Sequence, residues 1–532
     1  MLLTLLLISI VSLALYLFNK MIVMPTMYRT KYSKFSNVKM SSKATMFKGD
    51  AVEVKHNIDS GKHAFSHYID LAVSEEHTDI YLKFEGPNPV FVMLSPRALG
   101  QTSKLMPSRI DRDDSLINQN FGKIFYNSLN QLKSDANWKL RRNTLMKAIG
   151  LSFAPTYIQK LLDCMNRVVV SWKPKTTVDF TNEFAAVETS FMTQALLGKG
   201  FDHSQFKFDY QTQSNRVIQI TLHEVMARLR QECVSNVDNK LEVLLPFIND
   251  YNLCQPFRRI MTNVKHMSTK IQEFLQDSQD QESVYAKVKQ ETVCTDDELL
   301  ADILCLLFQG IGSTSHVTAL LMYYLNKHPQ VMDKCKQVYE EHGITTNGVL
   351  QTHKLTTGDL ENCEYADYVI KEALRLNTSV SKTAAYRTLE DVVICGVPIK
   401  KDNWITLENI GCLLDLKHWH EPLEFIPERF DPESEYFKSP MTGKARDPCA
   451  YPPFSAGLRA CPGQALAKLG IRVALPFLIT NLDYDIQYVK KNILTTPPET
   501  EEEQLSVETP ISFSNESQHH LEIDIKANKL HK

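Results

Sequence analysis

The sequence predicts one large, mainly α-helical domain with small β-sheets, preceded by an N-terminal transmembrane helix. The chain of 532 residues is 43% hydrophobic and 23% charged, an ordinary globular composition that excludes a disordered or fibrous protein. Helical periodicity dominates from about residue 118 to 338 and again over 360–376. From about residue 50 onward, no stretch has the composition of an inter-domain linker. These observations favour a single helix-rich domain.

The first nineteen residues carry no charged side chain, and most are Leu, Ile, Val, Ala or Phe. As a helix they extend roughly 28 Å, close to the ~30 Å hydrocarbon core of a bilayer. Basic residues follow this stretch: Lys20, Arg29, Lys31 and Lys34. The positive-inside rule then places the rest of the chain in the cytosol. A signal peptide cleaved after residues 12–14 is the alternative, but the apolar run continues past that site and lacks a charged start.

We therefore expect an anchor over residues 1–20, a polar and basic linker over 21–48, and one domain over 49–532. The net charge of -3 gives no electrostatic reason to expect a nucleic-acid partner. The eleven cysteines are scattered and show no C-x-x-C pair, so a disulfide framework or a zinc site is not indicated. Short alternating runs predict strands over 79–84, 90–94, 392–399 and 404–407.

Within the helical region, Trp138 and Arg142 stand one turn apart on a predicted helix. Basic residues surround them: Lys133, Lys139, Arg141 and Lys147. Such a cluster is either a solvated helix face or a surface that docks an acidic protein partner.

A long apolar helical pattern over 296–325 contains the segment Gln309-Gly310-Ile311-Gly312-Ser313-Thr314-Ser315. Two glycines loosen a helix, and hydroxyl side chains can bond to the freed carbonyl oxygens. The pattern predicts a kinked core helix. Further along, Glu372 and Arg375 share one helix face, an arrangement that contributes little to stability when it is exposed.

The strongest motif is the loop from Phe454 to Gly463, which contains Cys461. A thiolate that binds a metal needs backbone N–H donors and shielding from water. Gly457 and Gly463 allow a tight turn, and the helix that starts after the loop directs its positive end at the sulfur. Arg459 lies two residues before the sulfur, in position to meet a carboxylate. An ordinary structural cysteine is the alternative.

These motifs, in this order, resemble those of the cytochrome P-450 family over about residues 50–525. The resemblance implies the P-450 fold and a haem b group with Cys461 as axial ligand of the iron. It also implies an internal ion network of Glu372, Arg375 and Arg429, the last from Pro427-Glu428-Arg429-Phe430. The implied haem-contacting residues are Trp138, Arg142, Arg387, Phe454, Arg459, Cys461 and Gly463.

The resemblance weakens at the long helix, where the family carries a small residue, Gly, any residue, an acid and Thr. Here Gln309 replaces the small residue and Gly312 replaces the acid. Ser313 and Thr314 are therefore the candidate proton relay. The missing acid also leaves open an isomerase or dehydratase that rearranges a peroxide without O₂ or NADPH.

The resemblance implies a monooxygenase acting on a lipophilic sterol, fatty acid or xenobiotic. Its partners would be membrane lipid and an NADPH-dependent cytochrome P-450 reductase, with no nucleic acid. Its place would be the endoplasmic reticulum membrane, spanned once, with the catalytic domain in the cytosol. A haem-binding sensor or carrier without turnover is a third possibility. By family position, residues 110–125, 378–385 and 509–513 line the pocket, and the apolar loop 243–247 either enters the bilayer or is core.

Overall fold

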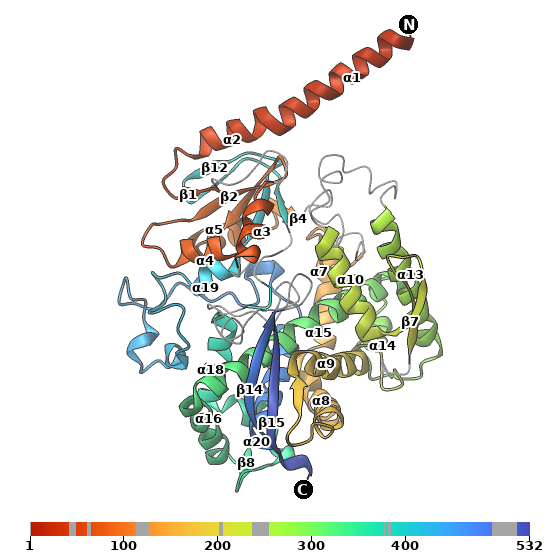
Figure 1. Cartoon of the computed structure of the whole chain (residues 1–532), viewed down its shortest axis with the longest axis vertical. Helices are drawn as coiled ribbons and strands as arrows, with labels where there is room; N and C mark the ends of the chain where they lie inside the picture. The colour runs from red at the N-terminus through yellow and green to blue at the C-terminus, as the bar shows by residue number, and fades with distance from the viewer. Residues whose placement is uncertain are drawn as a thin grey trace.

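The mainly helical fold with small sheets is confirmed by the structure, a computed structural model in which one long N-terminal helix projects from a helical body (Figure 1). The structure describes residues 2–41, 49–60, 65–112, 125, 127–201, 206–236, 255–376, 378–380, 383, 385–491 and 519–531. The apolar loop 243–247 and the expected pocket segment 509–513 lie outside these residues, as do most of 110–125 and part of 378–385.

The helices and strands are bounded as follows. The helices are α1 (Leu2–Phe18), α2 (Met24–Tyr32), α3 (Ala51–Asp59), α4 (Ser66–Ala72), α5 (Pro96–Leu105), α7 (Ala136–Ala148), α8 (Ala154–Val169), α9 (Phe180–Leu196), α10 (Leu222–Asn236), α13 (Gln255–Asp277), α14 (Val284–Gln290), α15 (Asp296–Lys327), α16 (Pro329–Glu341), α17 (Thr357–Glu361), α18 (Glu364–Leu376), α19 (Asn409–Leu413) and α20 (Gln464–Asn481). The strands are β1 (Val38–Lys39), β2 (Ile80–Glu85), β3 (Asn88–Met93), β4 (Ile110–Arg112), β5 (Thr177–Asp179), β6 (Lys207–Gln211), β7 (Val217–Thr221), β8 (Thr345–Thr346), β9 (Val349–Leu350), β10 (Tyr386–Thr388), β11 (Val392–Ile394), β12 (Val397–Ile399), β13 (Trp404–Leu407), β14 (Leu482–Lys491) and β15 (His519–Asn528).

Helix α15 runs through the main core and packs against α9, α18 and α20. Its start is fixed by a capping box, in which the Thr295 side chain accepts from the Glu298 backbone and the Glu298 side chain accepts from the Thr295 backbone. The helix continues unbroken through both glycines. A Cβ atom at Gly310 would lie 2.7 Å from Met192 Cε on α9, so a larger residue there would displace the end of the Met192 side chain. Gly310 therefore faces α9.

The largest sheet has the strand order β1-β2-β3-β13-β10-β4. Its buried side chains belong largely to a second hydrophobic cluster. All four predicted strand regions form strands, β2, β3, β11 with β12, and β13. Among the described residues, the region predicted as helical also contains strands β5, β6 and β7, and β6 and β7 pair as a hairpin. Phe208 and Tyr210 alternate there with exposed residues, and a polar turn around Asn215 joins the strands. The alternation of buried and exposed residues extends over too few positions to be distinguished from the surrounding helical pattern.

The N-terminal helix continues beyond the predicted anchor. A π-helical turn, Asn19–Val23, joins α1 to α2 without a break. Part of the expected linker is thus helical, and it rests on the body: Tyr28 Oη donates to Asn403 Oδ1 at 2.7 Å and Tyr32 Oη donates to the Pro398 carbonyl at 2.9 Å. Among the residues that the structure describes, two helices are long and apolar enough to cross a membrane, Thr4–Tyr32 and Asp296–Lys327, and the second of these is mostly buried in the core.

Candidate functional site

The loop that carries Cys461 is held in a fixed shape by its own backbone. The Cys461 N–H donates to the Phe454 carbonyl at 2.9 Å, which closes the loop. Gly457 adopts a positive φ of 74°, and a Cβ atom there would lie 3.2 Å from Ser103 Cβ. A side chain at this position would be strained and crowded at once. Helix α20 begins at Gln464, directly after the loop.

The Cys461 thiol is accessible and yet closely surrounded by protein. The residue is exposed, while surrounding protein atoms desolvate the thiol and raise its pKa. From these two observations we infer that the sulfur borders a recess in the protein, called the hollow below. The Gly463 N–H, the Arg142 charge and the Gln464 N–H act in the opposite direction and lower the pKa. The loop and the start of α20 therefore stabilise a thiolate, as a metal ligand requires.

Arginine side chains gather beside this sulfur. Arg142 donates to the Ala460 carbonyl next to Cys461. Arg459 stacks on the Trp138 ring, with Cζ 3.9 Å from the ring centroid, while Arg142 lies 5.4 Å from the same centroid. Arg112 belongs to the same group, since its charge lowers the pKa values of both Arg142 and Arg459. Burial is the larger cause in each case, and it lowers the pKa of Arg459 to about 10.

This cluster suits a group with two carboxylates. The charge of Arg112 disfavours the charged forms of Arg142 and Arg459, and Asp111 Oδ1 lies 3.4 Å from Arg459 Nη2. Partly buried like charges are stable together when anions join them. A flat macrocycle bearing two propionates, with its iron bonded to Cys461, would supply those anions and fill the hollow that the sulfur borders. The residues present therefore fit haem b.

The structure does not bring every predicted haem-contacting residue to this cluster. Phe454 and Gly463 lie in the loop, and Trp138 is buried with its indole N–H donating to the Leu129 carbonyl at 2.9 Å. Arg387, by contrast, pairs with Asp402, with Nε 3.2 Å from Oδ1. Its strand neighbour Tyr386 is the residue that stacks on Arg112, at 4.3 Å. Arg112 was not predicted, because a lone arginine in a three-residue strand carries no sequence signal.

One face of α15 borders the hollow. Gln309 is exposed and Gly312 and Ser313 are partly exposed on a helix that is otherwise mostly buried, and their spacing of three and four puts them on one face. Cys305 lies one turn earlier on this face. Burial raises its pKa to about 12, and part of the increase comes from Cys461 nearby. Cys461 therefore lies near this face of α15.

The two predicted relay residues occupy different sides of α15. The Ser313 hydroxyl lies on the accessible face and donates to the Gln309 carbonyl at 2.9 Å or the Gly310 carbonyl at 3.2 Å. Thr314 is only 7% exposed and also donates to the Gly310 carbonyl, at 3.2 Å. Its methyl group points to α20, since it lies 3.9 Å from where a Gly470 Cβ would be. Ser313 is thus the hydroxyl that can meet a ligand in the hollow.

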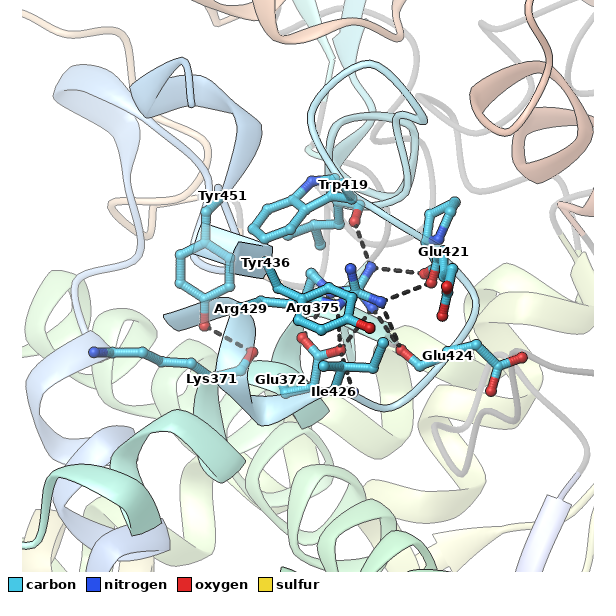
Figure 2. A network of polar contacts seen from close by, with 12 residues as sticks. Lys371, Glu372, Arg375, Trp419, Glu421, Glu424, Ile426, Arg429, Tyr436 and Tyr451 are labelled. Atoms are coloured by element: carbon cyan, nitrogen blue, oxygen red, sulfur yellow. Dashed lines mark hydrogen bonds and ion pairs between the residues drawn. The ribbon is translucent and has the colours of Figure 1, made fainter. Parts of the chain in front are cut away.

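The structure also brings together Glu372, Arg375 and Arg429, all fully buried (Figure 2). Arg375 donates two hydrogen bonds to the Glu372 carboxylate, from Nε to Oε2 at 2.7 Å and from Nη2 to Oε1 at 2.8 Å. Arg429 Nε donates to the same Oε1 at 2.9 Å. One carboxylate faces two arginines, so backbone carbonyls complete the network. They belong to Leu413, His420, Glu421, Pro422 and Glu424.

This network fixes the segment that leads to the cysteine loop. Trp419 covers Arg375 at 5.1 Å, and Tyr451, three residues before Phe454, donates to the Lys371 carbonyl at 3.0 Å (Figure 2). A further cation, Arg446, stacks on Trp419 at 4.2 Å and donates to the Arg429 carbonyl. Sequence reasoning missed Trp419 and Arg446, because isolated aromatic and basic residues in loops have no readable spacing.

The prediction that Arg141 belongs to a basic surface is wrong. Arg141 is 1% exposed and pairs with Asp302 at 2.7 Å and Glu298 at 3.1 Å, both on α15. It ties α7 to the start of α15 from inside. The three lysines of the predicted face, Lys133, Lys139 and Lys147, are exposed. The sequence did not separate Arg141 from the exposed lysines, because the partners that bury it, Glu298 and Asp302, are distant in the chain.

A mainly helical body around a cysteine loop, with basic side chains beside the hollow, defines a haem-thiolate class of protein, and comparison with known proteins agrees. The Cytochrome P450 family model matches residues 58–510. The chain belongs to the cytochrome P450 family, whose members bind haem b through a cysteine thiolate.

Individual relatives are similar over a shorter segment. Cytochrome P450 3A14 of Cavia porcellus is 30% identical over 190 residues, 36% of this chain and 35% of the relative. Cytochrome P450 3A5 of Homo sapiens is 30% identical over 190 residues with the same coverage. Cytochrome P450 71B5 of Arabidopsis thaliana is 31% identical over 192 residues, 36% of each chain. The matched segment thus spans about a third of the length of these relatives.

Proposed function

We propose that this protein is a haem-thiolate monooxygenase that inserts one oxygen atom of O₂ into a lipophilic small molecule such as a sterol, a fatty acid or a xenobiotic. One observation carries the proposal: the Cys461 thiol is accessible although protein desolvates it, with Arg142 beside it and the partly exposed Ser313 hydroxyl on helix α15. Electrons would come from NADPH through a cytochrome P-450 reductase.

In this proposal Cys461 would bind the haem iron, and Arg142 and Arg459 would hold the haem carboxylates, with the Trp138 ring packed against both arginines. Haem supplies the oxygen chemistry when it is bound, and a thiolate ligand favours cleavage of the O–O bond. The N–H groups of Gly463 and Gln464 stabilise negative charge on the sulfur. Arg387, which pairs with Asp402 through Nε, is the further predicted contact of the haem carboxylates.

Ser313 holds a proton at Oγ on the accessible face of α15 and passes it into the hollow. Its bonds to two backbone carbonyls keep the hydroxyl on that face. Thr314, the other predicted relay residue, is buried on another side of α15. The core that surrounds α15 is hydrophobic, which limits water in the hollow and favours lipophilic substrates.

The apolar N-terminal helix supports an anchor in the endoplasmic reticulum membrane, spanned once, with the body in the cytosol. The basic residues that follow α1 favour this orientation. The exposed lysines Lys133, Lys139 and Lys147 lie on or beside α7, which contributes Arg142 to the arginine cluster. They suit an acidic reductase domain that approaches the cysteine side of the haem.

The test is the spectrum of the reduced protein under carbon monoxide. A thiolate-ligated haem gives the P-450 absorption band, and we expect Cys461→Ser to abolish it. Cys449→Ser is the matched control, since Cys449 lies only twelve positions earlier but outside the loop, and the band should persist in it. A second measurement follows NADPH and O₂ consumption with a panel of lipophilic compounds. A globin-like carbonyl band in the unaltered protein would refute haem-thiolate ligation.

A second candidate function rests on Gly312, which stands where the family has an acid. An isomerase or dehydratase acting on a preformed peroxide needs no proton delivery to O₂ and no NADPH. Conversion of a lipid hydroperoxide without NADPH, together with no NADPH-driven product from the lipophilic panel, would favour this candidate over the monooxygenase.

A further inference from the structure

A buried aspartate on α15 joins this helix to α7. Asp302 is 4% exposed, and its Oδ2 accepts from Arg141 Nη2 at 2.7 Å. Arg141 Nη1 also donates to Glu298 Oε1, one turn earlier on α15, at 3.1 Å. Burial raises the pKa of Asp302 to about 6, and the charge of Arg141 opposes the rise. A carboxylate kept in the core at this cost needs strong partners on both of its oxygens.

The second oxygen of Asp302 binds the backbone of the loop that leads into α7. This loop, residues 127–134, is called the α7 loop below. Asp302 Oδ1 accepts from the Leu129 N–H at 2.6 Å. Arg141 Nη2 donates to the Asn127 carbonyl at 2.9 Å. The buried ion pair therefore holds the α7 loop against α15 at two points.

The α7 loop also holds the guanidinium group of Arg459. Arg459 Nη1 donates to the Leu129 carbonyl at 3.1 Å, and Nη2 donates to the Leu132 carbonyl at 2.5 Å. Arg459 Nε donates to Ser134 Oγ at 2.8 Å. The indole N–H of Trp138 shares the Leu129 carbonyl, at 2.9 Å. Three groups of one loop thus orient the arginine that stacks on Trp138.

Leu129 connects α15 to the arginine cluster through its own backbone. Its N–H donates to Asp302, and its carbonyl accepts from Trp138 and Arg459. Only the two backbone torsions of one residue separate these bonds. Leu129 is also packed in the main core, where it is 8% exposed, which restricts those torsions. A shift of the Asp302 carboxylate would therefore move the oxygen that both side chains share.

The path starts on the side of α15 that borders the hollow. Asp302 precedes Cys305 by three residues and Gln309 by seven. Residues with this spacing share one face of a helix, and Gln309 is the exposed member of the three. Hydrogen bonds therefore lead from this face of α15 to the side chains beside Cys461.

We infer that Asp302 is a positioning residue for haem, which holds Arg459 and Trp138 through Leu129 so that Arg459 meets a haem carboxylate. This inference rests on the haem contacts proposed above. Asp302 itself contacts neither the haem nor the reacting atoms in this role. Without its Oδ1, the buried Leu129 N–H would lose a charge-assisted hydrogen bond, and the α7 loop would keep only the Arg141 contact to α15.

The first test measures haem loss from the full-length haem-loaded protein to apomyoglobin. Asp302→Ala should speed the transfer at least about tenfold, as expected for the loss of a buried hydrogen bond to a charged group. Asp297→Ala, an exposed site in the first turn of the same helix, is the matched control and should behave like the unaltered protein.

A double-variant comparison separates positioning from general stabilisation. Arg459→Ala should also speed haem loss, and adding Asp302→Ala to it should speed the loss little further, because Asp302 acts through Arg459. A double variant whose effect equals the product of the two single effects would overturn the inference. Haem loss that is fast in Arg459→Ala and unchanged in Asp302→Ala overturns the inference alone. Unchanged haem loss in Arg459→Ala refutes the proposed contact of Arg459, and the inference with it.

The second test follows the haem carboxylates directly, by the resonance Raman band of their bending vibration. In Asp302→Ala this band should shift to its frequency in Arg459→Ala. Asp302→Asn keeps one oxygen that can accept from the Leu129 N–H, so its band should shift partway, and it serves alone if the alanine variant does not fold. Asp297→Ala should show no shift. A band that stays in place in the folded Asp302 variants while it moves in Arg459→Ala would contradict the role of Asp302, whether or not the enzyme turns over.

Discussion

At the scale of single residues, the informative side chains are charged groups that the fold buries. Arg142 and Arg459 lie beside the Cys461 loop, and burial lowers the pKa of each. Holding like charges together without solvent costs free energy that a bound dianion offsets. The sequence indicated these two arginines through their spacing from Trp138 and Cys461. It could not indicate Arg112, whose place depends on strand pairing between β4 and β10.

Replacing Arg142 with Ala should weaken haem retention. The change removes one cation from the cluster and a bond to the Ala460 carbonyl, a loss of about 1.5–3 kcal/mol or roughly tenfold or more in retention. The measurement is the haem content per protein after purification and the rate of haem transfer to apomyoglobin. Lys139→Ala, an exposed site on the same helix, is the control. Equal retention in the two variants would contradict this role of Arg142.

Glu188, a buried residue of α9, should make stability depend on pH. Burial of Glu188 raises its pKa to about 8 in the folded state. At pH values between the pKa of an unfolded Glu and about 8, the folded state therefore binds more protons than the unfolded state. The free energy of unfolding therefore falls as pH rises through this interval. Glu188→Gln should remove this slope and be more stable than the unaltered protein above pH 8, by a few kcal/mol. Denaturant unfolding at pH 5, 6.5 and 8 measures it, and parallel curves for the two proteins would contradict it.

At the scale of elements, helix α18 and the segment around Arg429 depend on one carboxylate. Glu372 bonds to both arginines and to the Ile426 N–H at 3.0 Å. Helix periodicity put Glu372 and Arg375 on one face, but an exposed pair has the same spacing. Only the tertiary contacts, which bring a segment about fifty residues away over α18, show that the pair is buried (Figure 2).

Neutralising Glu372 should destabilise the whole body. Glu372→Gln leaves two arginines buried against one amide, and breaking a buried ion pair costs about 3–5 kcal/mol. The melting temperature should fall by several degrees and haem content should drop with it. Glu364→Gln, at the exposed start of the same helix, should melt like the unaltered protein. Thermal unfolding followed by circular dichroism and haem absorbance makes the comparison, and a small change in Glu372→Gln would show that the carbonyl bonds suffice.

At the scale of the whole molecule, the order of motifs along the chain was enough to predict the fold. Each motif marks an element that packs near the cysteine loop, so their order constrains the topology. The sequence was less informative about details that depend on distant contacts. It predicted that Arg141 lies on a surface, whereas the structure buries this side chain between α7 and α15. It also gave no sign that Glu188 is buried, because a single Glu in a helical pattern predicts a solvated residue.

Electron delivery should depend on the lysine face as a unit. Replacing Lys133, Lys139 and Lys147 with Gln should slow reduction by a cytochrome P-450 reductase at low salt and flatten the dependence of the rate on salt, because exposed charges act through screened attraction. Stopped-flow reduction under carbon monoxide measures this. The matched control replaces the exposed Lys173, Lys175 and Lys199. Identical rates and salt slopes in both triple variants would reject docking at this face.

The unbroken helix from α1 through α2 has a mechanical consequence (Figure 1). Hydrogen bonds from Tyr28 and Tyr32 fix the end of α2 to the body. A bilayer that holds α1 would therefore also set the orientation of the body relative to the membrane. One residue inserted in the π-helical turn would swing the body by about 100° around the anchor. It would thereby turn a different side of the body toward the bilayer.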